Sequence, residues 1–404
     1  MIVDELRIVG STQTNVVMAA ELIRVARRAI GVRPPEPRKE GLGQLVYPFD
    51  RDLAWAAVTY LRTPTRVVWD VYRSRATRLE PLYDELVADI RGDARALWRD
   101  GDGISVEARR VEDFAAGERQ IVGTVKNALV DTLARRGIRL HVDSGAGRGS
   151  RPLHGPQGPA TRWVARQDDR GELVVSIDLG GGSLSRRGWR REAGEAPLRE
   201  HLAAVLLMLS RFDPRADVLV DPMCGSGTIP IEAVHMARAT PRSTPGLDAL
   251  GIAGPAGQPA APLYADAAPL VIGCDIDLEV LAAARDNARA ARCTDAITWQ
   301  RADVATLTPQ LVADIARERG REPPRAGLLL ANPPYGERLD EQDLEAIYGA
   351  LARTCQRFAG WRAGFLVGNP LLERVFMDVL GRPRIKKPLA NANLRAYFYL
   401  YELS

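Results

Sequence analysis

A short motif, Asn332-Pro333-Pro334-Tyr335, carries the most specific chemistry in this 404-residue sequence. It directly follows the apolar run Leu328–Leu330, which is typical of a buried strand. The two prolines fix φ and remove two N–H donors, so the chain must leave the sheet in an extended, rigid form. The motif therefore holds an amide and an aromatic ring stiffly at the carboxyl end of a strand, where open α/β sheets bind ligands.

These groups suit a nucleobase whose exocyclic amine is to be alkylated. Such an amine is a poor nucleophile because its lone pair is delocalised into the ring. Hydrogen bonds from it to the side-chain oxygen of Asn332 and the carbonyl of Pro333 would favour a pyramidal nitrogen aimed at an electrophilic methyl group. Alignment alone can be worth roughly 7–11 kcal/mol. Tyr335 would stack on the base, which must leave its helix or loop to reach the site. A rigid proline turn without chemistry is the alternative explanation.

A glycine-rich stretch, Asp221-Pro-Met-Cys-Gly-Ser-Gly-Thr228, joins the strand-like run Val218–Val220 to a predicted helix. It is neither a P-loop nor a dinucleotide fingerprint, because no Gly-Lys-Ser/Thr follows and only two glycines fit the second pattern. Those glycines let the backbone approach a ligand closely. The carboxylate of Asp221 and the backbone N–H groups suit a ligand with an ammonium and a carboxylate, such as a methionine moiety. A purely structural turn is the alternative.

The next two predicted strands also end in acidic residues. Asp275 is placed to accept hydrogen bonds from ribose hydroxyls, and Asp277 to cap the helix 278–291, although the two roles can be exchanged. Asp303 follows the third strand and is placed to meet an adenine amino group. A single Asp after a strand is usually a helix cap, but Asp residues at the ends of three consecutive strands indicate a shared binding site.

The second half of the chain has the pattern needed to bring these residues together. From Pro197 onward, strand and helix candidates alternate, which predicts a mostly parallel sheet with helices on both faces. The Ala-, Pro- and Gly-rich segment 246–267 is expected to be a flexible insertion without chemistry. The expected elements are a helix over 197–210, strands over 218–220, 270–274, 297–302, 328–331 and 363–367, and an antiparallel pair over 384–389 and 394–401.

The first 180 residues mix short strands and helices without a regular βαβ repeat, which indicates small α+β domains. The basic, Trp-bearing stretch Ser183–Arg191 is interpreted either as a connection that touches RNA or as an exposed linker. The segment 145–160 is expected to be a mobile loop. Helices are expected over 16–30, 52–61, 79–90 and 121–133, and strands over 43–47, 66–73, 104–108, 163–166 and 173–179.

Composition adds weaker constraints. A charged content of 26% and a net charge of +4 fit an ordinary globular protein, and the excess of Arg gives weak support for a nucleic-acid partner. A solvated arginine-rich surface explains the same charge equally well. The four cysteines and four histidines show no metal-ligand or disulfide spacing, and no cysteine adjoins Pro333 or Pro334 as covalent cytosine-C5 methylation requires. With no signal peptide or membrane-spanning run recognised, a cytoplasmic protein with reduced thiols and no metal is expected.

The motifs, in this order and at these spacings, resemble those of class I S-adenosylmethionine methyltransferases. More closely, they resemble the THUMP-domain RNA guanine-N2 methyltransferases that act on tRNA or large-subunit rRNA. The stretches Ser183–Arg190 and Ala196–Ala204 match the junction into that family's catalytic domain. The resemblance is strong over residues 183–404, weaker over 45–180 and poor over the first forty residues, and the segment 246–267 departs from the family pattern.

The resemblance implies an α/β fold, with a Rossmann-like class I methyltransferase sheet over 184–404 preceded by a ferredoxin-like and THUMP RNA-binding region over 1–183. The implied reaction is methyl transfer from the cofactor S-adenosyl-L-methionine to N2 of a guanosine in structured RNA, with no membrane partner. Arg199 and Glu200 would pass near the cofactor, and Glu337 and Arg338 would orient the loop, meet phosphate or form a surface ion pair. The implied catalytic residues are Asn332, Pro333, Pro334 and Tyr335, and the implied cofactor-binding residues are Asp221, Cys224, Gly225, Ser226, Gly227, Thr228, Asp275, Ile276, Asp303, Val304 and Asn332.

Other functions share parts of this pattern. DNA adenine-N6 methyltransferases carry the same Asn-Pro-Pro-Tyr signature, but a large target-recognition domain would accompany it and none is visible. Methylation of protein glutamine uses the signature as well. A non-catalytic RNA-binding protein with a degenerate fold would have lost the glycine turn or Asn332, and both are intact. The sequence does not indicate tRNA or rRNA, the target nucleotide, the number of methyl groups or the oligomeric state.

Overall fold

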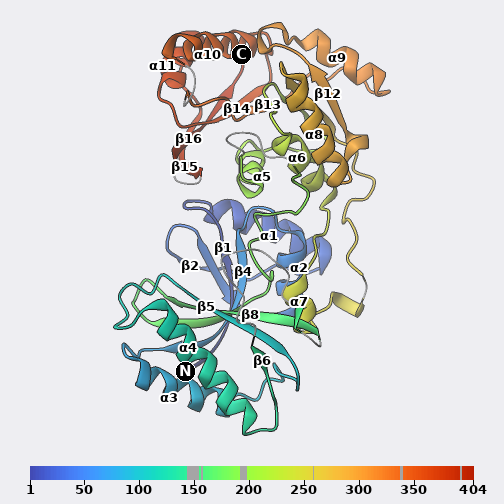
Figure 1. The fold of residues 1–404 in the computed structure, drawn as a ribbon. Coiled ribbons are helices and arrows are strands. Elements are labelled where there is room, and N and C mark those ends of the chain that lie inside the picture. The colour runs from blue at the N-terminus through green and yellow to red at the C-terminus, as the bar shows by residue number, and fades with distance from the viewer. Residues whose placement is uncertain (143–153, 156–157, 192–197, 258, 337–339, 392–393) are drawn as a thin grey trace. The chain divides into compact units, whose positions relative to one another are not determined.

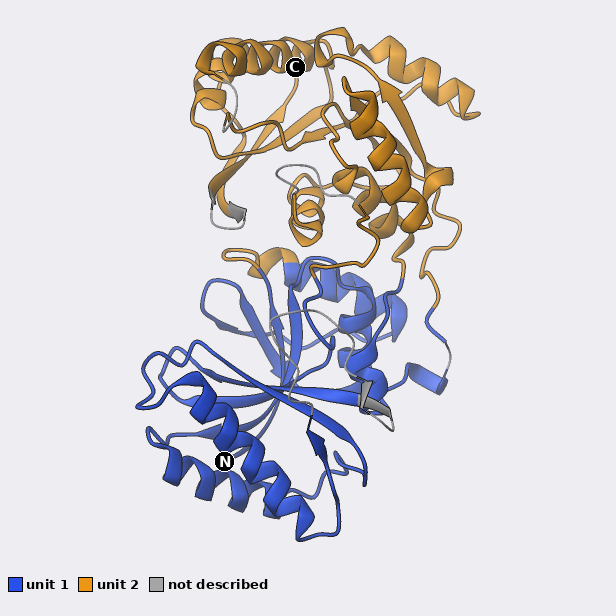
Figure 2. Ribbon diagram, in the orientation of Figure 1, with its two compact units in different colours: residues 1–10, 18–184, 241–260 blue, residues 11–17, 185–240, 261–404 orange. Residues whose placement is uncertain are grey.

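The computed structural model describes residues 1–142, 154–155, 158–191, 198–257, 259–336, 340–391 and 394–404 (Figure 1). They form two compact units (Figure 2): unit 1 comprises residues 1–10, 18–184 and 241–260, and unit 2 comprises 11–17, 185–240 and 261–404. The segment 145–160, expected to be a mobile loop, lies mainly outside the described residues. No helix within the described ranges is long and apolar enough to cross a membrane.

Unit 2 is built on a seven-stranded sheet with helices on both faces. Its main elements are α5 (Glu200–Leu209), β10 (Val218–Asp221), α6 (Thr228–Arg238), β11 (Leu270–Asp275), α8 (Leu278–Ala290), β12 (Ile297–Arg301), α9 (Pro309–Glu318), β13 (Gly327–Ala331), α10 (Glu341–Gln356), β14 (Arg362–Val367), α11 (Leu371–Leu380), β15 (Ile385–Asn391) and β16 (Leu394–Glu402). The strand order is β12-β11-β10-β13-β14-β16-β15. The strands β10 to β14 pair in parallel, whereas β16 pairs antiparallel with β14 and β15.

The central strands of this sheet carry apolar residues on both faces, as parallel strands covered by helices do. In β13, Leu328 and Leu330 pack with residues of α5, α6 and α8. Leu329 and Ala331 pack on the opposite face with residues of α9, α10 and α11. All four side chains are fully buried. The prediction of a mostly parallel, Rossmann-like sheet with a terminal antiparallel strand is confirmed.

Unit 1 is an α+β unit on a nine-stranded sheet. Its elements are β1 (Ile2–Val9), α1 (Asn15–Ala29), β2 (Arg38–Glu40), β3 (Gln44–Pro48), α2 (Arg51–Tyr60), β4 (Arg66–Ser74), α3 (Leu79–Gly92), β5 (Gly103–Arg109), α4 (Glu118–Ala134), β6 (His141–Val142), β7 (His154–Gly155), β8 (Gly158–Gln167), β9 (Leu173–Asp178) and α7 (Pro245–Ala249). The order is β2-β3-β1-β4-β9-β8-β5-β6, and β7 pairs with β8. The assignment of this region as ferredoxin-like plus THUMP stays a prediction.

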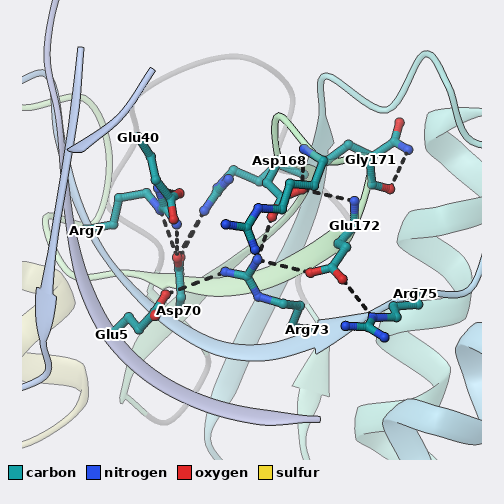
Figure 3. A network of polar contacts seen from close by, with 12 residues as sticks. Glu5, Arg7, Glu40, Asp70, Arg73, Arg75, Asp168, Gly171 and Glu172 are labelled. Atoms are coloured by element: carbon teal, nitrogen blue, oxygen red, sulfur yellow. Dashed lines mark hydrogen bonds and ion pairs between the residues drawn. The ribbon is translucent and has the colours of Figure 1, made fainter. Parts of the chain in front are cut away.

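The central strand β1 was not predicted, because its charged residues interrupt the apolar pattern. The structure accommodates them in a network of ion pairs, which Figure 3 shows. Arg7 is fully buried, and its Nε lies 2.8 Å from Asp70 Oδ2 of β4 and its Nη1 lies 2.6 Å from Glu40 Oε2 of β2. Arg73 continues the network to Asp168, at 2.5 Å. The partners that stabilise β1 are therefore 33 to 63 residues away in sequence.

The expectation that segment 246–267 is a flexible insertion is wrong for its first part, because residues 241–260 belong to unit 1. Leu247 and Ile252 are buried there. The guanidinium of Arg51 donates to the carbonyl of Gly251 over 3.0 Å. A Cβ atom on Gly254 would lie only 2.6 Å from the ring of Trp55. The small residues that resemble a linker in the sequence therefore permit close packing.

Candidate active site

The predicted site residues converge at one edge of the unit 2 sheet. In the order β12-β11-β10-β13, Asp303 follows the first strand, Asp275 ends the second, Asp221 ends the third and Asn332 follows the fourth. The register pairs Asp221 with Gly273 and Asp275 with Arg301. Because these strands are parallel, their carboxyl ends share one edge, which is the ligand-binding edge of such sheets.

The glycine-rich loop between β10 and α6 turns on two left-handed residues, Gly225 at φ +52° and Gly227 at φ +84°. A Cβ atom on Gly225 would meet nothing within 4 Å, so this position is open to a ligand. A Cβ atom on Gly227 would lie 2.7 Å from the ring of Trp299, and one on Gly273 would lie 2.5 Å from it. Gly225 therefore fits the predicted close approach to a ligand, whereas Gly227 is required by the packing of Trp299, which was not predicted.

Asp221 is a buried carboxylate without a cationic partner among the described residues. It is 1% exposed, and its Oδ1 accepts a hydrogen bond from Met223 N over 3.2 Å. Burial raises the pKa of Asp221 well above its ordinary value, and the nearby carboxylate of Asp275 raises it further. Two acids this close favour a cationic ligand, because it offsets both the burial and the repulsion. Burial also raises the pKa of the Cys224 thiol, which is therefore neutral.

Asp275 ties the second strand to the glycine-rich loop. Its Oδ2 accepts from Gly225 N over 3.0 Å, and its Oδ1 accepts from Asp277 N over 3.1 Å. Each carboxylate oxygen keeps a further lone pair for a hydroxyl donor. Asp277 caps α8 by accepting from Glu279 N over 2.8 Å, so the predicted capping role of Asp277 is confirmed.

Ile276, Asp303 and Val304, which are predicted to bind the cofactor, follow β11 and β12 at the same edge. Ile276, directly after β11, is 60% exposed although it is apolar. Asp303 is exposed, and its side chain accepts from Ala305 N over 2.8 Å, so it caps a short 3-10 turn. The carbonyl of Val304 accepts from Thr354 Oγ1 over 2.8 Å, which fixes this turn to α10.

The Asn-Pro-Pro-Tyr turn is held from both sides. The hydroxyl of Tyr335 donates to Asn332 Oδ1 over 2.9 Å. The hydroxyl of Tyr348, on α10, donates to the carbonyl of Pro334 over 2.6 Å, and Asn369 Nδ2 donates to the carbonyl of Tyr335 over 3.0 Å. An amide oxygen has two lone pairs, so Asn332 can accept a second hydrogen bond from a substrate amine. The turn is thus held by several hydrogen bonds, and Asn332 Oδ1 can still accept one more.

Tyr335 itself is half-buried. A Cβ atom on Gly368 would lie 3.1 Å from its ring, so the ring packs against the backbone that follows β14. Stacking of Tyr335 on a target base stays a prediction. Glu337 and Arg338, for which a loop-orienting or phosphate-binding role was expected, lie outside the described residues.

Sequence reasoning missed the residues that support the turn. Asn369 follows the buried strand β14 just as Asn332 follows β13, so a polar residue after an apolar run was a usable signal. Tyr348 lies among the buried residues of α10, where an aromatic residue looks like ordinary core.

The stretch Ser183–Arg191 is partly buried. Trp189 is 5% exposed. The guanidinium of Arg187 pairs with the buried Glu232 at 3.1 Å, and that of Arg190 pairs with the buried Glu200 at 3.2 Å. These three side chains pack inside unit 2, so the interpretation as an exposed linker is wrong for them, whereas contact of the stretch with RNA stays a prediction. Glu200 thus contacts Arg190, which in turn contacts the glycine-rich loop, and Arg199 is exposed.

Comparison with known proteins agrees with this geometry. Residues 187–389 match the family described as RMKL-like, methyltransferase domain. The ribosomal RNA large subunit methyltransferase K/L of Syntrophotalea carbinolica is 40% identical over 226 residues, which are 51% of this chain and 30% of that protein. The chain therefore spans less than a third of the length of this curated relative.

Solved structures share the fold over the whole chain. The structure of SMU.472 in complex with SAH has a TM-score of 0.76 at 23% identity and covers 99% of this chain and 98% of that one. TrmN from Thermus thermophilus has a TM-score of 0.67 at 21% identity and covers 100% of both chains. A predicted N6-adenine-specific DNA methylase from Listeria monocytogenes has a TM-score of 0.75 at 24% identity, with 99% and 96% covered. The chain belongs to the RMKL-like methyltransferase-domain family.

Proposed function

We propose that this protein methylates the exocyclic N2 amine of a guanosine in structured RNA. The observation that carries the proposal is the rigid Asn332–Tyr335 turn, which follows β13 beside β10 and its glycine-rich loop. The amide oxygen of Asn332 is thereby placed on the same sheet edge as the predicted cofactor residues. The name of the Syntrophotalea relative supports an rRNA substrate.

The residues at this edge of the unit 2 sheet fit S-adenosylmethionine. The buried Asp221, which has no cationic partner among the described residues, suits its ammonium group, and the open backbone at Gly225 suits its methionine portion. Asp275 would accept from the ribose hydroxyls, with Ile276 and Val304 beside the adenine and Asp303 at its amino group. The cofactor, when bound, supplies a methyl group made electrophilic by the attached sulfonium. Ser226 and Thr228 lie on the α6 side of the loop.

The protein's own contribution to the transfer is orientation. Amide and carbonyl oxygens are weak bases, so Asn332 and Pro333 act by accepting hydrogen bonds that direct the lone pair of the amine. The hydroxyl of Tyr335 fixes the Asn332 amide, and Tyr348 fixes the carbonyl of Pro334. A turn held at these points needs little reorganisation when the base arrives.

DNA adenine-N6 methylation is the alternative, since the signature is compatible with it and the Listeria neighbour carries that title. That neighbour is 24% identical, so the similarity supports a shared fold and does not indicate a shared substrate. The choice of guanine in RNA rests on the sequence resemblance over residues 183–204 and on unit 1, which we propose to be the RNA-binding part.

One experiment separates these functions. Purified protein is incubated with radiolabelled S-adenosylmethionine and either total RNA, genomic DNA or a protein extract, and the labelled product is digested and identified. We expect N2-methylguanosine from RNA, with the Asn332→Ala variant as the inactive control. Label recovered as N6-methyladenine from DNA, or as methylglutamine from protein, would refute the proposed substrate.

A further inference from the structure

The guanidinium of Arg190 spans the glycine-rich loop. Its Nη1 lies 3.2 Å from Ser226 Oγ, and its Nη2 lies 3.1 Å from Thr228 Oγ1. These two hydroxyls flank Gly227, the left-handed residue at φ +84° after which α6 begins. Both hydroxyl-bearing residues are buried. One arginine therefore contacts the loop on each side of its tightest point.

The same guanidinium is anchored firmly on its other side. Its Nε lies 3.2 Å from Glu200 Oε1, and its Nη2 lies 2.9 Å from the carbonyl of Leu198. The group also lies 5.3 Å from the ring centroid of Trp189, which is buried. With 17% of its side chain exposed, Arg190 is held in one orientation by a carboxylate, a carbonyl and an aromatic face.

A second buried side chain, Asn287 of α8, also contacts the loop. Its Nδ2 donates to the carbonyl of Ser226 over 3.0 Å, and its Oδ1 accepts from Arg191 N over 2.8 Å. Asn287 is fully buried. The hydrogen bonds run from Arg190 through Ser226 to Asn287 and return to the backbone of Arg191. We call Arg190 and Asn287 the loop brace.

We propose that the loop brace consists of positioning residues that hold the glycine-rich loop in its cofactor-binding conformation before the cofactor arrives. Gly225 and Gly227 are the residues with the most backbone freedom to lose, so an unbraced loop would populate other conformations. The cost of ordering it would then be subtracted from the binding free energy. The inference rests on the assignment of this loop to S-adenosylmethionine. The brace acts through Ser226 and Thr228.

An arginine is needed at position 190 because four acceptors surround it: two hydroxyls, one carbonyl and one carboxylate. The five N–H donors of a guanidinium form a planar fork that serves them together. A lysine keeps the charge beside Glu200 but cannot serve both hydroxyls and both anchors at once. Arg190→Lys therefore separates the brace from simple charge neutralisation of Glu200.

The test is binding of S-adenosylhomocysteine by isothermal titration calorimetry, together with kcat and KM for S-adenosylmethionine in RNA methylation. For Arg190→Lys we expect the Kd and the KM to rise about 10- to 30-fold, as loss of one or two charge-assisted hydrogen bonds implies, with kcat at saturating cofactor within about threefold. Arg190→Ala combined with Glu200→Gln avoids an orphaned buried charge and should give the same pattern. Arg289→Ala, an exposed arginine on α8 that is paired with Asp286, is the matched control and should change neither constant.

A double-mutant cycle connects the effect to the loop. If Arg190 acts through the hydroxyl of Thr228, the effect of Arg190→Lys with Thr228→Val is smaller than the product of the two single effects. Multiplicative effects, or unchanged affinity in a folded Arg190→Lys protein, would overturn the inference. Failure of the unmodified protein to bind S-adenosylhomocysteine would instead refute the cofactor assignment on which the inference rests.

Discussion

The hydroxyl of Tyr348 offers a sharp test of whether the catalytic turn works by rigid positioning. It donates to the carbonyl of Pro334 over 2.6 Å, from a helix residue that is fully buried. Tyr348→Phe removes one oxygen atom and keeps the ring, so the packing of α10 is preserved. The change leaves the Pro334 carbonyl without this donor and touches neither the cofactor loop nor Asn332 directly.

The substitution is expected to lower both the stability and the rate. Loss of one partner of a buried hydrogen bond destabilises a protein by about 1–3 kcal/mol. Pro334 lies two residues from Asn332, so a shift of its carbonyl moves the acceptor for the substrate amine. Since a misplacement of about 1 Å can cost about 10²-fold in rate, we expect kcat to fall roughly 10- to 100-fold.

The measurement is kcat at saturating RNA and S-adenosylmethionine, with the affinity for S-adenosylhomocysteine determined separately. The affinity should stay unchanged, the opposite of the pattern expected for Arg190→Lys. Tyr397→Phe, at a partly exposed tyrosine of β16, is the control for loss of a hydroxyl. A folded Tyr348→Phe protein with normal kcat would refute the idea that this hydrogen bond positions the turn. A loss of cofactor affinity would show that the hydroxyl acts on cofactor binding and not on the position of the turn.

Three further predictions follow from the same structure. Asn332→Ala should keep binding S-adenosylhomocysteine but lose methyl transfer, and near-normal RNA methylation by this variant would show that the role assigned to Asn332 is wrong. Gly227→Ala combines a left-handed φ with a Cβ atom 2.7 Å from the ring of Trp299, so it should lower the free energy of unfolding by about 1–3 kcal/mol or more. Gly225→Ala shares the left-handed φ but has open space around its Cβ atom, so it should destabilise the fold less and should also weaken cofactor binding. Thermal unfolding and titration would distinguish the two glycines, and equal destabilisation by both would contradict the assignment. Burial and the positive charges of Arg187 and Arg199 lower the pKa of His201 to about 3. Because the unfolded chain takes up that proton near pH 6.5, the stability contributed by neutral His201 is complete above that pH and is lost as the pH falls toward 3. The decrease in unfolding temperature between about pH 7.5 and about pH 5 should therefore be smaller in His201→Gln, and identical decreases would exclude this cause.

The sheet of unit 2 was predictable because local sequence and tertiary environment agree. The run Leu328–Leu330 is apolar at every position, and the structure buries it on both faces. A polar residue that ends such a run must lie at the sheet edge, so the convergence of Asp221, Asp275 and Asn332 followed from pattern alone. The hydrogen-bond partners of these side chains could not be predicted in the same way. Tyr335 donates to Asn332 and Gly225 N donates to Asp275, and neither contact is visible in the sequence pattern.

Two of the misses share one physical cause, which is that polar groups find their hydrogen-bond and ion-pair partners far away in the sequence. Arg7 looks incompatible with a buried strand until Asp70 and Glu40 are placed beside it. Arg190 looks like a basic surface residue until Ser226 and Thr228 reach it. A single sequence assigns charge to solvent by default, and only the fold reveals where a charge is neutralised.

The segment 241–260 changes how the role of unit 1 can be tested. The resemblance places the RNA-binding region over 1–183, which would make deletion of an N-terminal module a simple test. In the structure Leu247 and Ile252 are buried within unit 1, and Gly254 packs on Trp55 of α2. Deletion would expose these apolar residues on the remaining chain, so loss of RNA methylation by that protein would be explained by misfolding as well as by lost RNA binding. An informative test must keep unit 1 folded and alter only its exposed side chains.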